Sequence, residues 1–185
     1  MNYYHMEWKF IEDEASFSTE EAWYRVHNNY YPNIKAYTTP IKVSVDEVYE
    51  QRQMSDMLKA IDFLPHKKMV QQLLSQQISG IQFLPAEVDV DGTIYNDYWF
   101  MNVFARYPVL NISESEAEDF NEDYEAYEDL MFTVLDKDKL SKVNVMHDIF
   151  RSSDCPDHII ANERVKQLFE SNGFTGVAFN EVKVA

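Results

Sequence analysis

The amino-acid sequence predicts an α+β fold in which a single compact body is built around a mixed or antiparallel sheet. Three observations favour this fold class. Hydrophobic residues make up 45% of the 185 residues and aromatic residues 15%, which is enough to fill the core of one domain. Short apolar or alternating runs, typical of strands, are interspersed with a few helical patterns. Two helical patterns are each followed by a glycine turn and a strand, which forms a weak internal repeat.

The first predicted elements lie between residues 41 and 84. Ile41–Val45 alternates apolar and polar residues, as a half-buried strand does. Ile61–Leu64 is a short strand candidate, and Gly80 precedes a further strand over Ile81–Leu84. Between them, Lys67–Gln77 is predicted as a helix with one apolar face, formed by Met69, Val70, Leu73 and Leu74.

The middle of the chain contains a turn and the longest acidic stretch. Asp91-Gly92 is typical of a hairpin turn, and Tyr98–Phe104 is predicted as a buried strand. Ser113–Asp129 is predicted as an acidic helix, because its apolar residues recur at steps of three and four. These residues would form one stripe facing the core: Ala117, Phe120, Tyr124, Tyr127 and Leu130.

The last third of the chain combines short strands with one helix. Met131–Leu135 is a strand-like apolar run. Asn162 is predicted to cap a helix that runs to about Ser171 and ends at Gly173. Three further strands are expected, over Ile149–Arg151, His158–Ile160 and Gly176–Phe179.

The internal repeat aligns Gly80 with Gly176. It pairs apolar residues of the two helices and the two strands: Met69 with Val165, Leu73 with Phe169, Ile78 with Phe174 and Phe83 with Phe179. The pattern predicts two pseudo-symmetric halves of one body, although any helix–glycine–strand corner would share part of it. Residues 1–60, which are rich in aromatic and acidic side chains, are expected to pack on a main body formed by residues 61–185, within one globular unit.

The net charge of the chain limits the kinds of molecule that it is expected to bind. Lys plus Arg total 16 against 32 Asp plus Glu, which gives a net charge of −16 with His neutral. Such a field repels phosphate backbones and anionic lipids, so direct binding to nucleic acid or membrane is disfavoured. It attracts a basic protein and accelerates the encounter, while the alternative is that the acidity only keeps the protein soluble.

The sequence indicates an intracellular protein. Cys155 is the single cysteine, so no internal disulfide can form, which fits a reducing compartment. The N-terminus lacks the basic and apolar regions of a secretory signal, and no apolar run is long enough to span a membrane. We therefore expect a cytoplasmic protein.

The motifs of catalysis and metal binding are missing from the sequence. No histidine pair has zinc-ligand spacing, and no Gly-x-Ser-x-Gly or glycine-rich phosphate loop occurs. Cys155 lies near His147 and His158 in the sequence, without a family signature around it. We therefore predict no catalytic residue, metal or cofactor. A site centred on Cys155 or on scattered carboxylates is the enzymatic alternative.

The acidic stretch is the candidate binding surface. No Lys or Arg occurs between Arg106 and Lys137, and like charges at helical spacing destabilise a helix slightly. Such a surface either serves solubility or is presented to a cationic partner. The residues predicted to contact that partner are Glu114, Glu118, Asp119, Glu122, Asp123, Glu125 and Glu128.

The C-terminal part of the chain resembles a family of bacterial polymorphic-toxin immunity proteins (immunity family eleven). Asp148–Arg151, then Ile159-Ile160, a helix and Gly173–Phe179 resemble the end of that family, and Ile78–Pro85 followed by Tyr98–Val103 resembles its centre. The resemblance covers about Ile61 to Val184. It implies a protein that binds and neutralises a cognate secreted toxin, often a nuclease, and it brings no catalytic residues. An acidic adaptor without a toxin partner remains an alternative.

Overall fold

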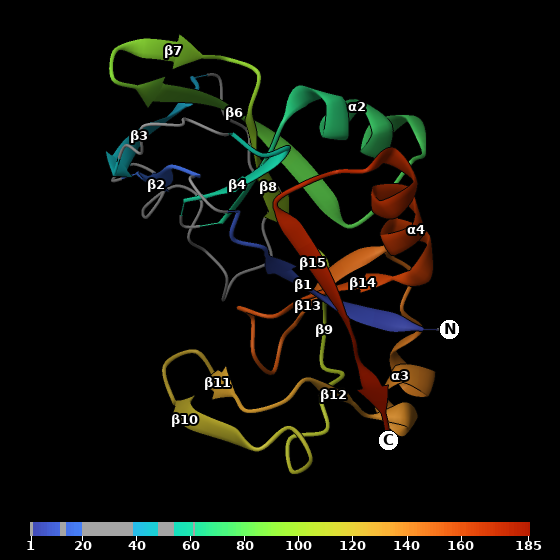
Figure 1. The fold of residues 1–185 in the computed structure, drawn as a ribbon. Coiled ribbons are helices and arrows are strands. Elements are labelled where there is room, and N and C mark those ends of the chain that lie inside the picture. The colour runs from blue at the N-terminus through green and yellow to red at the C-terminus, as the bar shows by residue number, and fades with distance from the viewer. Residues whose placement is uncertain (1, 12–13, 20–38, 48–53, 61) are drawn as a thin grey trace.

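The computed structural model describes residues 2–11, 14–19, 39–47, 54–60 and 62–185 (Figure 1). It confirms the predicted α+β class: two five-stranded sheets, three smaller strand pairs and the helices α2, α3 and α4 are present in this part of the chain. No helix among the described residues is long and apolar enough to cross a membrane.

The first sheet joins both ends of the chain. Its strands are, in spatial order, β15 (Val177–Glu181), β1 (Tyr3–Trp8), β14 (Ile159–Asn162), β13 (Ile149–Ser152) and β9 (Arg106–Tyr107). Only β13 and β9 are parallel. The N-terminal strand β1 is therefore enclosed between two strands from the end of the chain.

The second sheet is centred on the long strand β6. It contains β2 (Ser16–Ser18), β3 (Ile41–Glu47), β6 (Ile81–Val90), β7 (Thr93–Tyr95) and β8 (Trp99–Val103). β3 runs parallel to the end of β6, while β8 is antiparallel to its start. The strands predicted at Ile41–Val45 and Tyr98–Phe104 and the turn at Asp91-Gly92 are confirmed. The division of the chain at residue 60 stays a prediction.

Two of the helices predicted from the sequence are present and begin where expected, although the one predicted over Lys67–Gln77 ends two residues earlier, at Ser75. α4 (Glu163–Asn172) is capped by Asn162, whose side chain accepts from the backbone N–H of Val165 at 3.2 Å, and it ends at Gly173 with φ +64°. α2 (Lys67–Ser75) buries three residues of the predicted face, Met69, Val70 and Leu73. The fourth, Leu74, is exposed. α3 (Lys137–Val143) was not among the predicted helices.

The remaining strands are short. β4 (Met57–Lys59) pairs with β5 (Phe63–Pro65), β10 (Ala117–Asn121) with β11 (Ala126–Leu130), and β12 (Val134–Leu135) with β16 (Lys183–Val184). Of the strand predicted over Met131–Leu135, only the last two residues pair.

The internal repeat has a structural basis in its two glycines. Gly80 lies between α2 and β6 with φ +94°, and Gly176 lies between α4 and β15 with φ +84°. A Cβ atom on Gly80 would meet the Ile149 carbonyl oxygen at 1.9 Å, and one on Gly176 would meet the Met57 carbonyl oxygen at 2.1 Å. Both the backbone angle and the close approach therefore require glycine.

The two halves of the chain, residues 3–90 and 98–184, exchange their first strands. β1 belongs to the first half but pairs with β14 and β15 of the second, whereas β8 of the second half pairs with β6 of the first. The registers correspond, because Met6 lies opposite Phe179 as Met101 lies opposite Phe83. Each half thus completes the sheet of the other.

A reciprocal pair of hydrogen-bonded contacts joins the halves. The N–H and hydroxyl of Ser79 both donate to Asp148 Oδ2 at 2.9 Å, and the Asp148 N–H donates to Ser79 Oγ at 3.2 Å. The N–H and hydroxyl of Thr175 donate to Asp56 Oδ2 at 3.1 Å, and the Asp56 N–H donates to Thr175 Oγ1 at 3.0 Å. Each half supplies one aspartate and one hydroxyl residue.

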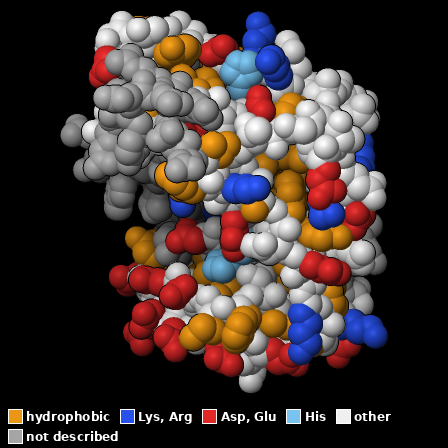
Figure 2. All heavy atoms as spheres, viewed as in Figure 1, with side chains coloured by type: hydrophobic (Ala, Val, Ile, Leu, Met, Phe, Trp, Pro, Cys, Tyr) orange, Lys and Arg blue, Asp and Glu red, His pale blue; other side chains and the backbone are white. Residues whose placement is uncertain are grey.

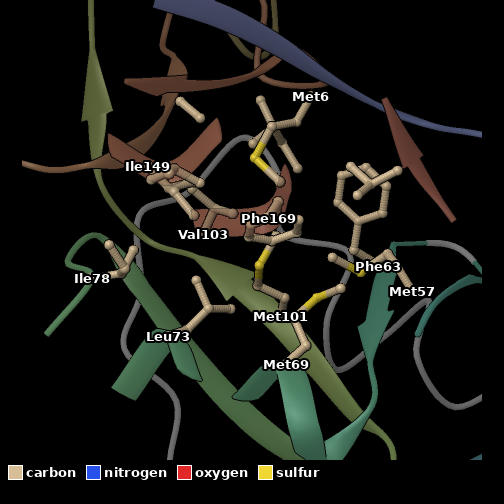
Figure 3. Packing of buried hydrophobic residues seen from close by; sticks show 14 residues of the cluster. Met6, Met57, Phe63, Met69, Leu73, Ile78, Met101, Val103, Ile149 and Phe169 are labelled. Carbon is tan, nitrogen blue, oxygen red and sulfur yellow. The ribbon is translucent and has the colours of Figure 1, made fainter. Parts of the chain in front are cut away.

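The core lies where the two halves meet. Its first cluster combines side chains of β1, α2, β8, β13 and α4, which converge in Figure 3, among them Met6, Leu73, Met101, Ile149 and Phe169. All five are at most 2% exposed. A second cluster fills the β6 sheet, and a third lies beneath the segment that carries β10 and β11.

Candidate functional site

The acidic stretch is a β-hairpin, so the helix predicted over Ser113–Asp129 is wrong. β10 and β11 are antiparallel, with Phe120 opposite Tyr127 and their rings edge to face at 5.0 Å. A helix would have brought several carboxylates together at three- and four-residue spacing. In the hairpin, the Asn121 side chain instead accepts from the Asp123 N–H at 3.0 Å and donates to Glu128 at 2.6 Å. Local turn contacts and a cross-strand aromatic pair therefore replace the helical stripe.

The predicted apolar stripe is divided between the core and the surface. Leu130 is buried, and Ala117 and Tyr127 pack partly against the third core cluster. Phe120 and Tyr124, also predicted to lie in the core, are 52% and 44% exposed, so that prediction is wrong for both. Phe120 turns outward because strand alternation, not the helical period, sets its direction, and Tyr124 is exposed because it lies on the turn between β10 and β11.

Three acidic residues of this segment have left-handed backbone angles. Glu116, Asp119 and Glu125 have φ values of +48°, +53° and +52°. Glycine or asparagine adopts this conformation more readily than glutamate, which pays a small backbone cost there. The segment therefore keeps carboxylates at positions where the backbone alone would favour other residues.

The base of the hairpin is fixed to the body by hydrogen bonds. Ser115 is fully buried, and its hydroxyl lies 3.2 Å from both the N–H and the carbonyl oxygen of Val134. The Phe132 N–H donates to the Ser115 carbonyl at 3.1 Å. Farther along, the Tyr127 N–H donates to the Asp154 carbonyl at 2.8 Å. These contacts hold the exposed part of the hairpin in a defined position on the body.

All seven predicted contact residues are exposed. Glu118, Asp119, Glu122, Asp123, Glu125 and Glu128 lie on the two strands and their turn. Glu114 lies apart, on the turn before β10, where Lys183 forms an ion pair with it. At the lower left of Figure 2, where Figure 1 places β10 and β11, acidic side chains gather beside a hydrophobic patch. Whether these residues contact a partner stays a prediction.

Exposed apolar side chains accompany the acids. Nine large hydrophobic residues are exposed in the described part of the chain, and four of them lie between residues 120 and 132: Phe120, Tyr124, Met131 and Phe132. Met131 is 63% exposed and Phe132 55%. Sequence reasoning missed this patch, because it placed these residues in a helix stripe and a strand. The turn-forming Asn121-Glu122-Asp123 was the signal that could have indicated a hairpin.

A pocket of about 510 Å³ opens beside the base of the hairpin. One wall is Leu130–Val134, and the other walls come from β1, from His158 just before β14, from Glu114 and from residues 180–183. Glu7 and Glu114 contribute carboxylates and Lys183 contributes one cation, whereas Glu181 lies opposite Tyr4 and turns its side chain to the other face of the sheet. The exposed Met131 and Phe132 form its apolar rim.

Two stacked histidines form part of this pocket. The rings of His5 and His158 lie 4.5 Å apart at an interplanar angle of 20°. Burial lowers the pKa of both imidazoles to about 4, and for His158 the neighbouring His5 lowers the pKa further. Both rings are therefore neutral at pH 7. His5 lies 2.9 Å from a Glu7 oxygen, and His158 lies 3.0 Å from the Thr133 hydroxyl.

The region around Cys155 does not have the properties of a nucleophilic site. The thiol is fully buried, and burial raises its pKa to about 12, so the reactive thiolate is disfavoured at neutral pH. A second pocket of about 470 Å³ lies nearby, where Arg151 and Asp62 form a buried ion pair. Within the described residues, no group of three or more His, Cys, Asp or Glu side chains is placed to hold a metal ion.

Comparison with known families identifies a relationship over nearly the whole chain. The family described as immunity protein family (Imm11) matches residues 9–184. This match begins much nearer the N-terminus than the motif resemblance, which began at Ile61, so it includes the acidic hairpin and both halves except for β1. Among curated proteins, none matches this chain significantly.

Proposed function

The chain belongs to the immunity protein family Imm11, and from that membership we propose that its acidic hairpin binds a cognate toxin domain and neutralises it by occlusion. An immunity protein acts by binding, so the chain needs no catalytic group for this role. The proposed place of action is the cytoplasm of the toxin-producing cell.

The observation that carries the proposal is the charge of the hairpin segment. Residues 114–129 contain nine carboxylates and no Lys or Arg, which accounts for more than half of the net charge of −16. The hairpin pairs with no other strand among the described elements, and its acids are exposed. A rigidly anchored, strongly negative projection favours rapid association with a basic surface.

We propose that the toxin is a basic nuclease. A nuclease must bind phosphates, so its substrate-binding surface carries cationic side chains. The carboxylates of Glu118, Glu122, Asp123 and Glu125 would lie against those cations and exclude the nucleic acid. Because long-range attraction between exposed charges is screened by salt, this association should weaken as ionic strength rises.

The test uses the toxin domain encoded beside this gene, with and without this protein. Co-expression should rescue cells from the toxin, and the purified proteins should form a complex. Replacing Glu118, Glu122, Asp123 and Glu125 with their amides should slow association by about tenfold at low salt and flatten its salt dependence. Stopped-flow or surface-binding kinetics at several salt concentrations would measure both effects.

A matched variant controls for net charge. It carries amides at four acids outside the hairpin, Glu87, Asp91, Asp138 and Glu170, and should retain most of the wild-type association rate. Equal effects of the two variants would show that the hairpin has no special role. Absence of both rescue and binding by the unaltered protein would exclude the immunity function for this toxin.

A further inference from the structure

The pocket beside the hairpin base differs in character from the acidic hairpin itself. Its rim presents two large apolar side chains, and its interior is lined by carboxylates and by neutral histidines. The acids on the hairpin lie on a convex projection, whereas this site is concave, and a concave site can enclose a single side chain of a partner.

Exposure of Met131 and Phe132 points to an interface. They are consecutive residues, more than half exposed, at the end of an otherwise charged segment. Their neighbours Leu130 and Val134 are buried, so the chain leaves the core for two residues and then returns. Apolar side chains surrounded by charged groups have the arrangement of an interface centre, where burial of a few residues supplies most of the binding energy.

The charges of the pocket select a cation. Glu114 already forms an ion pair with Lys183, and Glu7 lies against the neutral ring of His5. Glu181 lies opposite Tyr4 in the sheet, so its side chain points to the other face and only Glu7 and Glu114 direct carboxylates into the pocket. With both histidines neutral at pH 7, Glu7 is a carboxylate that no cation of the described residues neutralises.

We propose that this pocket binds an arginine side chain of the toxin, an inference that rests on the proposed function. The planar guanidinium stacks on the face of Phe132, its aliphatic stem packs on Met131, and its N–H groups donate to the two carboxylate oxygens of Glu7. Arginine fits better than lysine because it can stack on an aromatic ring and donate to both oxygens of one carboxylate at once.

The pocket and the hairpin then have separate roles in binding. The hairpin acids act at long range and determine how fast the toxin associates. The pocket acts after contact and determines how slowly the complex dissociates, since burial of an apolar and charged anchor is lost only on separation. The two roles predict different kinetic signatures.

The experiment measures dissociation of the catalytically inactivated neighbouring toxin domain from variants of this protein. Phe132→Ala and Glu7→Gln should each raise Kd by about tenfold or more through faster dissociation, with association nearly unchanged. Met146→Ala is the matched control, because Met146 is 74% exposed but lies outside the pocket. It should leave both rates within about twofold of wild type. Thermal unfolding of each variant would show that the fold is intact.

Replacing each arginine of the toxin in turn with glutamine identifies the partner side chain. One replacement should weaken binding to the wild type about tenfold but have little further effect on the Glu7→Gln variant, since both changes remove the same contact. Tight binding that no pocket variant weakens would overturn the arginine pocket while leaving the proposed function intact. Coupling to a lysine alone would overturn the choice of arginine, and failure of the wild type to bind would overturn both proposals.

Discussion

The two halves of the molecule share a frame but differ in the segment that each inserts into it. In the frame, strand, helix, left-handed glycine and strand recur, and each half offers an aspartate to the hydroxyl residue of the other. Between β1 and β4 the first half inserts a segment that adds β2 and β3 to the edge of the β6 sheet. Between β8 and β13 the second half inserts the segment that carries the acidic hairpin.

Under the proposed function, this difference separates the residues that stabilise the fold from those that recognise the toxin. Frame residues must fit their counterparts across the interface of the halves, so a change in one affects both. The hairpin of the second insert pairs only with itself in the described structure, so its surface can change without disturbing either sheet. A protein that must match one particular toxin benefits from this separation, because specificity can be altered on a constant core.

Replacing the frame glycines should give the largest effect. Gly80→Ala and Gly176→Ala each place a Cβ within 2.1 Å of a backbone oxygen at positive φ, so each should cost about 4 kcal/mol or prevent folding. Gly92→Ala is the control, since its φ is +82° but no atom lies within 4 Å of the added Cβ. It should cost only about 1 kcal/mol. Urea unfolding would measure all three, and a mild effect at one frame glycine alone would break the equivalence of the halves.

Breaking the buried ion pair should give the next largest effect. Arg151 and Lys59 are counterparts in β13 and β4, but Arg151 is buried and paired with Asp62, whereas Lys59 is exposed. Asp62→Asn leaves the guanidinium without its counterion and should cost about 3 kcal/mol in the free energy of unfolding. Lys59→Met should change it by less than about 0.5 kcal/mol. Similar losses of unfolding free energy in Asp62→Asn and Lys59→Met would mean that the Arg151–Asp62 ion pair does not stabilise the fold.

Acidification should destabilise the protein through the stacked histidines, which lie where β1 of the first half meets the second half. The folded pKa of His5 and His158 is about 4, below the value of about 6.5 of an unfolded chain. As the pH falls below about 6.5, the histidines of the unfolded state become protonated while those of the folded state stay neutral. The free energy of unfolding therefore declines down to about pH 4. The loss from pH 7 to 5 should approach about 2 kcal/mol for each ring.

Replacing His5 with its counterpart in the second half tests the histidine origin of this loss. In β8 the residue that corresponds to His5 is Phe100. His5→Phe should therefore reduce the difference in unfolding free energy between pH 7 and pH 5. An unchanged pH dependence in that variant would assign the loss to the carboxylates.

The sequence predicted the elements whose signals are local. Asn162 and Gly173 bound α4 by their own cap chemistry, and the strands at Ile41–Val45 and Tyr98–Phe104 follow from apolar patterning. The exchange of β1 and β8 between the halves could not be predicted from the sequence, because tertiary packing decides which strands pair when they are distant in the chain. The hairpin failed for a related reason: the spacing of Ala117 to Leu130 fits a helix, and contacts such as that of Tyr127 with Asp154 decide otherwise. The acidic residues were found by composition, but the pocket beside them depends on the fold.

The smallest expected effect on the unfolding free energy comes from replacing an acidic turn residue in the hairpin or in the β6–β7 turn. Glu125 and Asp91 are both acidic, exposed turn residues with left-handed backbone angles, one in the hairpin and the other between β6 and β7. Replacing either with glycine relieves the backbone cost but adds freedom to the unfolded chain, so each should change the unfolding free energy by at most about 0.5 kcal/mol. Only Glu125→Gly removes a charge from the surface proposed to face the toxin.

Glu125→Gly should therefore slow toxin association by about twofold to threefold at low salt, while Asp91→Gly leaves it unchanged. Stability and association rate measured on the same two variants would show whether the left-handed glutamate is retained for recognition. If both variants bind the toxin as fast as the wild type, the carboxylate at this turn serves solubility, and the recognition surface must lie nearer to the hairpin base. If both slow association equally, net charge governs the encounter and the projection itself adds nothing.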